Sequence, residues 1–258
     1  MKRLVLAVLA AFVLISAPAS AATKPTIVLV HGAFADASGW NGVTERLQGK
    51  GYKVLAPANP LRGVSADAAY LKNVLSHVSG PIVLVGHSYG GVAITNAATG
   101  NPNVKALVYV AAFVPAQGET VQALSTPGGG SMLGVETLDI APDGSGTPDG
   151  LEGTIKLSAF REVFAADLPR KLANVMAVSQ RPASLVTLGE PSGPPAWTSI
   201  PSFALIPTKD NTIGTGNLRT MAKRAKAKIV EVKGASHVVM TSQPQVTADF
   251  ILRAVKGK

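Results

Sequence analysis

The chain has 258 residues, of which 47% are hydrophobic and 15% are charged, and its formal net charge at pH 7 is +9. This composition excludes an intrinsically disordered chain, and the length suits one large α/β domain or two small ones. The chain contains no cysteine, which excludes a disulfide scaffold, a thiolate metal site and a cysteine nucleophile.

Residues 1–21 have the composition of a secretory signal peptide. Lys2 and Arg3 provide positive charge, residues 4–15 are apolar, and residues 19–21 are Ala-Ser-Ala. A signal peptidase requires this order of charge, apolar run and small residues, and a buried N-terminal helix would not explain it. The apolar run is too short to cross a bilayer comfortably, and no later run is long enough. We therefore predict an exported protein, periplasmic or secreted, with no stable membrane insertion.

Downstream, short apolar runs rich in β-branched residues alternate with amphipathic stretches. The predicted strands are residues 26–30, 52–55, 82–85, 106–110, 202–206 and 228–232. The predicted helices are residues 38–48, 66–78, 89–98, 218–224 and 245–255. The strands are apolar nearly throughout, which is typical of strands buried on both faces of a parallel sheet. Together the elements predict an α/β fold with a doubly wound, mostly parallel sheet in one domain, residues 22–258.

The alternation stops between about residues 115 and 200, where Gly and Pro are frequent. Residues 126–130 and 141–146 are turn-like, whereas residues 151–164 and 169–179 have a helical pattern. The helical stretches are amphipathic and need a partner surface, and an unstructured loop of this length is uncommon in a compact domain. We therefore predict a small helical cap inserted between two strands of the sheet.

Basic residues are concentrated near the end of the chain. They are Arg219, Lys223, Arg224, Lys226, Lys228 and Lys233. Without Lys2 and Arg3, 22 Lys and Arg remain against 15 Asp and Glu, so a nucleic-acid interface has to be considered. However, the spacing fits the exposed face of a helix followed by a strand, and an exported protein meets little nucleic acid. We therefore expect a solvated face and no nucleic-acid partner.

The strongest chemical signal is Gly86-His87-Ser88-Tyr89-Gly90, which lies between an apolar run and a helical pattern. Gly-x-Ser-x-Gly alone is a weak motif, but in this context it is typical of a nucleophilic serine on a sharp turn. The two glycines leave room for the neighbouring strand and helix, and a helix N-terminus favours negative charge. We predict that Ser88 is the nucleophile, in preference to a serine that only caps the helix.

A serine nucleophile needs a base, and the chain has four histidines. His77 falls late in a predicted helix, His31 closes a predicted strand, and His87 is expected to point away from Ser88 on so tight a turn. His237 follows the strand 228–232 in a loop beside the sheet. By elimination, His237 is the predicted base.

The base needs a carboxylate that holds its tautomer. Asp210 follows the strand 202–206, so it lies on a loop next to that of His237. Glu119, after the strand 106–110, is the alternative acid. The four histidines are dispersed without the spacing of metal ligands, and we expect no metal and no cofactor.

With these motifs the chain resembles the α/β-hydrolase superfamily over essentially its whole mature length. The order Ser88, Asp210, His237 is the order of that superfamily, and residues 28–34, Val-Leu-Val-His-Gly-Ala-Phe, also match it. The chain is most similar to the small-capped branch, which contains plant methylesterases, salicylate-binding esterases, hydroxynitrile lyases and many bacterial esterases.

The resemblance also implies an oxyanion hole. In this chain the backbone N–H groups of Ala33 and Tyr89 would form it, and His31 and Gly32 would shape the loop that presents Ala33. The lyases of the branch carry a threonine and a lysine where this chain has Gly32 and Val238. Without a cation beside the base, stabilisation of a cyanide leaving group is hard to explain, so hydrolysis is the preferred reaction.

We predict a serine hydrolase that cleaves small to medium hydrophobic carboxylic esters through an acyl-enzyme. The expected substrate contacts are Phe34, Phe113, Val238 and the cap residues Phe160, Phe164 and Trp197. The alternatives are a lyase, a lactonase or a C–C hydrolase on the same triad, and a non-catalytic protein that binds a small molecule. The sequence leaves the oligomeric state open.

Overall fold

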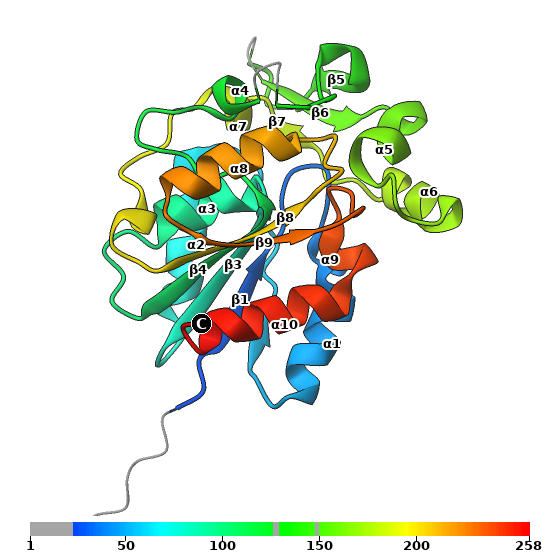
Figure 1. The fold of residues 1–258 in the computed structure, drawn as a ribbon. Coiled ribbons are helices and arrows are strands. Elements are labelled where there is room, and N and C mark those ends of the chain that lie inside the picture. The colour runs from blue at the N-terminus through cyan, green and yellow to red at the C-terminus, as the bar shows by residue number, and fades with distance from the viewer. Residues whose placement is uncertain (1–22, 126–128, 148–149) are drawn as a thin grey trace, which may run out of the picture.

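The computed structural model describes residues 23–125, 129–147 and 150–258 (Figure 1). The predicted signal peptide, residues 1–21, lies outside the described residues. Within the described ranges, no helix is long and apolar enough to cross a membrane.

The six predicted strands form one parallel sheet with the order β2-β1-β3-β4-β8-β9. They are Thr26–Val30 (β1), Val54–Leu55 (β2), Ile82–Ser88 (β3), Val104–Ala112 (β4), Ser202–Pro207 (β8) and Lys228–Val232 (β9). Every residue of β1 and β3 is buried, as expected for central strands that are covered on both faces. The prediction of a doubly wound, mostly parallel sheet is confirmed.

Helices cover both faces of this sheet (Figure 1). They are Asn41–Gly49 (α1), Val64–Ser76 (α2), Gly90–Ala97 (α3), Thr215–Arg224 (α8) and Pro244–Val255 (α10). Helices α2, α3 and α8 lie on one face, and α1 packs with α10 on the other. The two faces follow from right-handed crossovers, because the chain moves one way along the sheet from β1 to β2 and the other way afterwards.

The segment between β4 and β8 differs in part from its prediction. It contains α4 (Val121–Leu124), η2 (Val135–Thr137), β5 (Leu138–Pro142), β6 (Leu151–Ile155), α5 (Leu157–Phe164), α6 (Arg170–Val178), β7 (Ala183–Ser184), α7 (Val186–Gly189) and η3 (Ala196–Thr198). Strands β5, β6 and β7 form a small antiparallel sheet, so the insertion is not purely helical.

The prediction of a helix over residues 151–164 is wrong for its first five residues, which form β6. Gly153 has low helix propensity, and the β-branched Thr154 and Ile155 favour a strand. Leu138 of β5 pairs with Ile155, and the ladder extends along β6. Pairing with a strand distant in sequence therefore decides the conformation here, and the helix starts only at Leu157.

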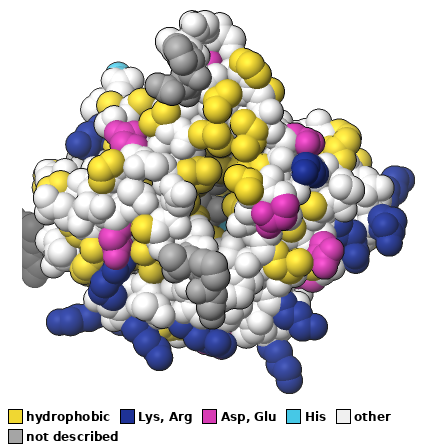
Figure 2. Space-filling model, turned by 90° about the horizontal axis from the view of Figure 1, so that it is seen from above, with side chains coloured by type: hydrophobic (Ala, Val, Ile, Leu, Met, Phe, Trp, Pro, Cys, Tyr) yellow, Lys and Arg dark blue, Asp and Glu magenta, His cyan; other side chains and the backbone are white. Residues whose placement is uncertain are grey.

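The parallel sheet determines where the predicted site lies. Because all six strands run the same way, the loops after β1, β3, β8 and β9 meet at one edge of the sheet. The β5–β7 sheet and α5 lie beyond this edge, at the top of Figure 1. Seen from above in Figure 2, hydrophobic side chains gather round a hollow near the middle of this face.

Candidate active site

Ser88 sits in a strained turn between β3 and α3. Its φ is +54°, a value that non-glycine residues adopt infrequently. A Cβ on Gly86 would lie 2.6 Å from the Gly90 carbonyl oxygen, and a Cβ on Gly90 would lie 2.5 Å from the Val30 oxygen. Both positions therefore have to be glycine for the strand and the helix to meet so closely. Ser88 lies at the point of this turn and is buried, with 4% of its surface exposed.

His237 and Asp210 form a buried pair on the loops after β9 and β8. His237 Nδ1 lies 2.7 Å from Asp210 Oδ2, and both side chains are completely buried. The other carboxylate oxygen, Oδ1, accepts hydrogen bonds from the backbone N–H groups of Thr212 at 2.9 Å and Ile213 at 2.8 Å. Because the oxygens of a carboxylate accept hydrogen bonds, Nδ1 carries the proton that it donates to Asp210.

The other ring nitrogen of His237, Nε2, makes no hydrogen bond within the described part of the chain. Nε2 is buried and, among the described residues, has no hydrogen-bond partner, Ser88 included. An imidazole whose Nδ1–H is donated to a carboxylate carries a lone pair on Nε2, which is the atom that accepts a proton in general-base catalysis. In the absence of substrate such catalytic hydrogen bonds are often long.

Glu119, the alternative acid, is bonded elsewhere. It accepts from Arg224 Nη2 at 2.7 Å and from the Ala116 N–H at 2.8 Å. Partial burial raises the pKa of Glu119, but the hydrogen bonds from Arg224 and the Ala116 N–H, together with the charge of Arg224, outweigh it and lower that pKa. Arg224, from the predicted basic run, is thereby paired on the surface, and Arg219 is paired with Glu231 at 2.7 Å. Of the two candidate carboxylates, the structure brings Asp210 to His237.

Two backbone N–H groups beside Ser88 make no hydrogen bond to any residue that the structure describes. A Cβ on Gly32 would lie 2.5 Å from Ser88 Cβ and 3.1 Å from Tyr89 N, so the Gly32–Ala33 turn packs against Ser88. Among the described residues, the N–H groups of Ala33 and Tyr89 donate to no other protein atom. Two free donors at this position can hydrogen-bond a developing oxyanion.

His31 holds the turn that carries Ala33. Its Nδ1–H donates to the Gly32 carbonyl oxygen at 2.9 Å, and its Nε2 accepts from the Asn59 N–H at 2.9 Å. Burial lowers the pKa of His31, so the ring is neutral, as these two bonds require. The next residue after Ala33, Phe34, has a φ of +60°, which marks the turn as sharply bent.

His87 lies against the proposed base and not in open surroundings. Its Nε2–H donates to the His237 carbonyl oxygen at 3.1 Å, and the two ring centroids are 4.6 Å apart. Burial and the proximity of His237 hold the pKa of His87 well below its ordinary value. The sequence suggested only that His87 points away from Ser88. Its contact with His237, distant in sequence, has no local signal.

The side chain of Tyr89 is anchored by a buried carboxylate that the sequence did not single out. Tyr89 donates its hydroxyl to Asp67 Oδ2 at 2.9 Å, and the Arg62 N–H donates to Asp67 Oδ1 at 3.0 Å. Asp67 is completely buried in the first turn of α2, and burial raises its pKa. An aspartate near a helix N-terminus is common on any helix, so its sequence position alone would not reveal this role.

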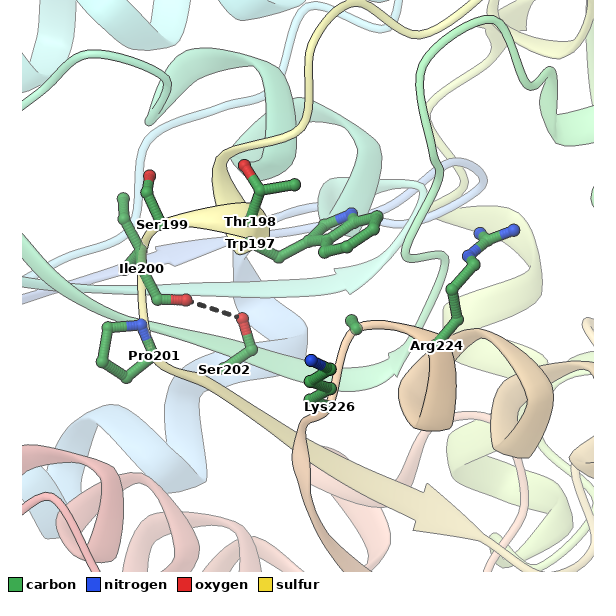
Figure 3. A pocket seen from close by; sticks show the side chains of 9 residues that line it. Trp197, Thr198, Ser199, Ile200, Pro201, Ser202, Arg224 and Lys226 are labelled. Carbon is green, nitrogen blue, oxygen red and sulfur yellow. Dashed lines mark hydrogen bonds between the residues drawn. The ribbon is translucent and has the colours of Figure 1, made fainter.

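The residues predicted to contact substrate fall into two groups. Phe34, Phe113 and Val238 are buried, and the fully buried Phe164 places its ring 4.9 Å from that of His237. Trp197 lies elsewhere: its Nε1–H donates to the Pro115 carbonyl oxygen at 2.8 Å. It lines a surface cavity of about 440 Å³ together with Arg224 and Lys226, and the walls of this cavity include no residue of the predicted triad (Figure 3).

In the described part of the chain, no three His, Asp or Glu side chains are grouped so that they could hold a metal ion. The clustered titratable groups of the site are instead the buried His237–Asp210 pair with His87 beside it.

The chain is similar to known α/β hydrolases in both sequence and structure. The profile of the "Alpha/beta hydrolase family" matches residues 27–250. The pyrethroid hydrolase of Sphingobium wenxiniae is 28% identical over 247 residues, covering 89% of this chain and 87% of the relative. Methylesterase 2 of Arabidopsis thaliana is 25% identical, covering 89% and 95%. Among solved structures, a pyrethroid hydrolase of Sphingobium faniae JZ-2 superimposes with a TM-score of 0.74 at 23% identity, covering 91% and 98%.

Proposed function

The chain belongs to the α/β-hydrolase family, and on that premise we propose that it hydrolyses carboxylic esters through an acyl-enzyme on Ser88. One observation carries the proposal. The buried His237–Asp210 pair leaves Nε2 of the imidazole free, at the same sheet edge as a serine in a strained strand–helix turn. Two free backbone donors adjoin that serine.

The proposed reaction follows from these roles. His237 Nε2 takes the Ser88 proton as the oxygen attacks the ester carbonyl, and the resulting oxyanion is bound by the Ala33 and Tyr89 N–H groups. Asp210 stabilises the imidazolium that forms. His237 then gives its proton to the departing alkoxide, and a water molecule, activated by the same base, releases the acid from Ser88. Each N–H donor is worth about 2.7–4 kcal/mol of transition-state stabilisation.

The relatives support the class of reaction. Those named above are a pyrethroid hydrolase and a methylesterase, and another, from Oryza sativa, is an esterase. Small to medium hydrophobic esters are the proposed substrates, because Phe34, Phe113, Phe164 and Val238 provide apolar surroundings. The uncharged Val238, directly after His237, favours hydrolysis over cyanide elimination, for which a cation would be needed there.

We further propose that the insertion, about residues 115–200, acts as a cap over this site, and that residues 1–21 direct export to the periplasm or the medium. The arrangement of α5 beyond the sheet edge supports the first proposal. The order of charge, apolar run and small residues supports the second. N-terminal sequencing of the protein recovered outside the cytoplasm tests it, and a chain that begins before residue 19 would contradict it.

The decisive test is the hydrolysis of p-nitrophenyl acetate, butyrate, hexanoate and octanoate by the wild type and by Ser88→Ala. We expect turnover by the wild type, with an optimum of acyl-chain length, and a loss of nearly all activity in Ser88→Ala. Gly49→Ala, at the exposed end of α1 with nothing near its Cβ position, is the control for handling. Equal inactivity of folded wild type and Ser88→Ala would overturn the proposal and favour a lyase, a lactonase or a binding protein.

A further inference from the structure

A short stretch of the proposed cap contacts both loops of the His237–Asp210 pair. We call residues 162–167, the end of α5 and the turn after it, the clamp segment. Its hydrogen bonds reach the loop after β8 and the loop after β9, although it is more than 40 residues away from both in sequence.

The first contact fixes the acid loop. The last carbonyl groups of a helix lack partners within it, and in α5 two of them are bonded by the residues after Asp210. Asn211 Nδ2 donates to the Glu162 oxygen at 3.0 Å, and Thr212 Oγ1 donates to the Val163 oxygen at 2.7 Å. The N–H of the same Thr212 donates to Asp210 Oδ1. One residue therefore joins the helix end to the carboxylate.

The second contact fixes the base loop. Ser236, directly before His237 and 2% exposed, donates its hydroxyl to Asp167 Oδ1. Phe164 places its ring 4.9 Å from the His237 ring. The imidazole thus lies between Phe164, Asp210 and His87, and the loop that carries it is tied to Asp167.

We propose that Asp167 is a positioning residue of the active site, acting through Ser236 to hold His237 at the geometry that proton transfer requires. Its carboxylate does not contact the reacting atoms, and it lies on the cap, whereas Ser236 belongs to the main sheet domain. The bond therefore couples the position of the cap to the position of the base. The inference rests on the proposed function, because it assigns a role within the same reaction.

Loss of the Ser236–Asp167 hydrogen bond should slow the reaction, because its acceptor is a carboxylate. A hydrogen bond to a charged acceptor is worth more than one between neutral groups, and its loss lets the loop sample positions in which Nε2 is misplaced. A displacement of about 1 Å costs up to about 10²-fold in rate, and we expect a loss of about tenfold in kcat for removal of this single bond. KM should change little, because neither side chain touches substrate.

The test uses the full chain with five variants. Asp167→Ala and Ser236→Ala each remove the Ser236–Asp167 hydrogen bond. The double variant lacks the same bond and no other. Asp167→Asn retains an oxygen that accepts from Ser236 and serves as the rescue. Glu162→Gln removes a carboxylate from the same segment without loss of a described side-chain bond, and is the matched control. Active sites are counted by titration with a serine-reactive p-nitrophenyl phosphonate, so that kcat refers to folded, reactive enzyme.

We expect a similar fall in kcat for both single alanine variants and no further fall in the double, because the three lack the same bond. Asp167→Asn should keep most of the rate, and Glu162→Gln should match the wild type. Unchanged kcat per active site in Asp167→Ala would overturn the inference, as would additive losses in the double variant. In either case, activity that Ser88→Ala abolishes would leave the esterase proposal intact. No ester turnover by the wild type would overturn both.

Discussion

Replacement of Asp210 by Asn should remove most of the esterase activity while preserving the fold. Asn has the same shape, and its oxygen can still accept from the three backbone N–H groups now bonded to Asp210 Oδ1. Its amide group, however, donates toward His237 Nδ1 and shifts the ring proton to Nε2, where the base needs a lone pair. The negative charge that stabilises the imidazolium is lost as well.

The size of the effect follows from the geometry. His237 Nδ1 and Asp210 Oδ2 are 2.7 Å apart and both side chains are fully buried. Unit charges centred about 4 Å apart interact by about 4 kcal/mol at an effective dielectric constant of about 20. At about 1.4 kcal/mol per factor of ten, this predicts a loss of about 10³-fold in kcat, to which the wrong tautomer adds.

The assay is kcat for p-nitrophenyl acetate per titrated active site, with Glu119→Gln as the matched control. Glu119 is the other carboxylate after a sheet strand, and its loss should leave kcat unchanged because it pairs with Arg224. The reasoning would be refuted if Asp210→Asn kept more than about a tenth of the wild-type kcat. Equal losses in the two variants would refute it too.

Three further predictions concern stability. Burial lowers the pKa of His31 and His87, whereas the unfolded chain binds these protons below about pH 6.5. The free energy of unfolding should therefore be constant above that pH and fall below it, and a urea midpoint unchanged between about pH 7.5 and about pH 5 would disagree. Gly90→Ala should lower the melting temperature by about 2–12 °C, since overpacking costs about 1–3 kcal/mol. Gly49→Ala, with open space at its Cβ position, should not lower it. Burial raises the pKa of Asp67 above 3.8, its value in the unfolded chain. The free energy of unfolding should therefore fall as the pH rises above 3.8 and the buried carboxyl group ionises. Asp67→Asn should therefore raise the urea midpoint at neutral pH and much less at about pH 3.5; an equal change at both would argue against burial of a charge.

Local chemistry explains why the Ser88 turn could be predicted. The two glycines, the apolar strand before them and the helix after them are contiguous, and each is required by atoms within a few residues or in the adjacent strand. The apolar runs likewise predicted the six strands of the main sheet, because a strand covered on both faces excludes polar side chains. These features need no knowledge of distant contacts.

The acid was an open choice for the opposite reason. Asp210 and Glu119 both follow sheet strands, and the sequence around each is compatible with a turn. The order of the strands places Asp210 beside His237, because β8 and β9 are neighbours. Glu119 instead meets Arg224, whose side chain reaches it from the end of α8.

By itself, the sequence determined the parallel sheet, the strained serine turn and the short set of residues able to act as base. Only the tertiary structure decided that residues 151–155 form a strand, that Asp67 anchors Tyr89, and that Asp167 and His87 contact the loop of His237. The physical reason is the distance along the chain over which each kind of interaction acts. Periodicity and glycine sterics act between neighbours in the chain, whereas hydrogen bonds across dozens of residues depend on how the packed elements meet.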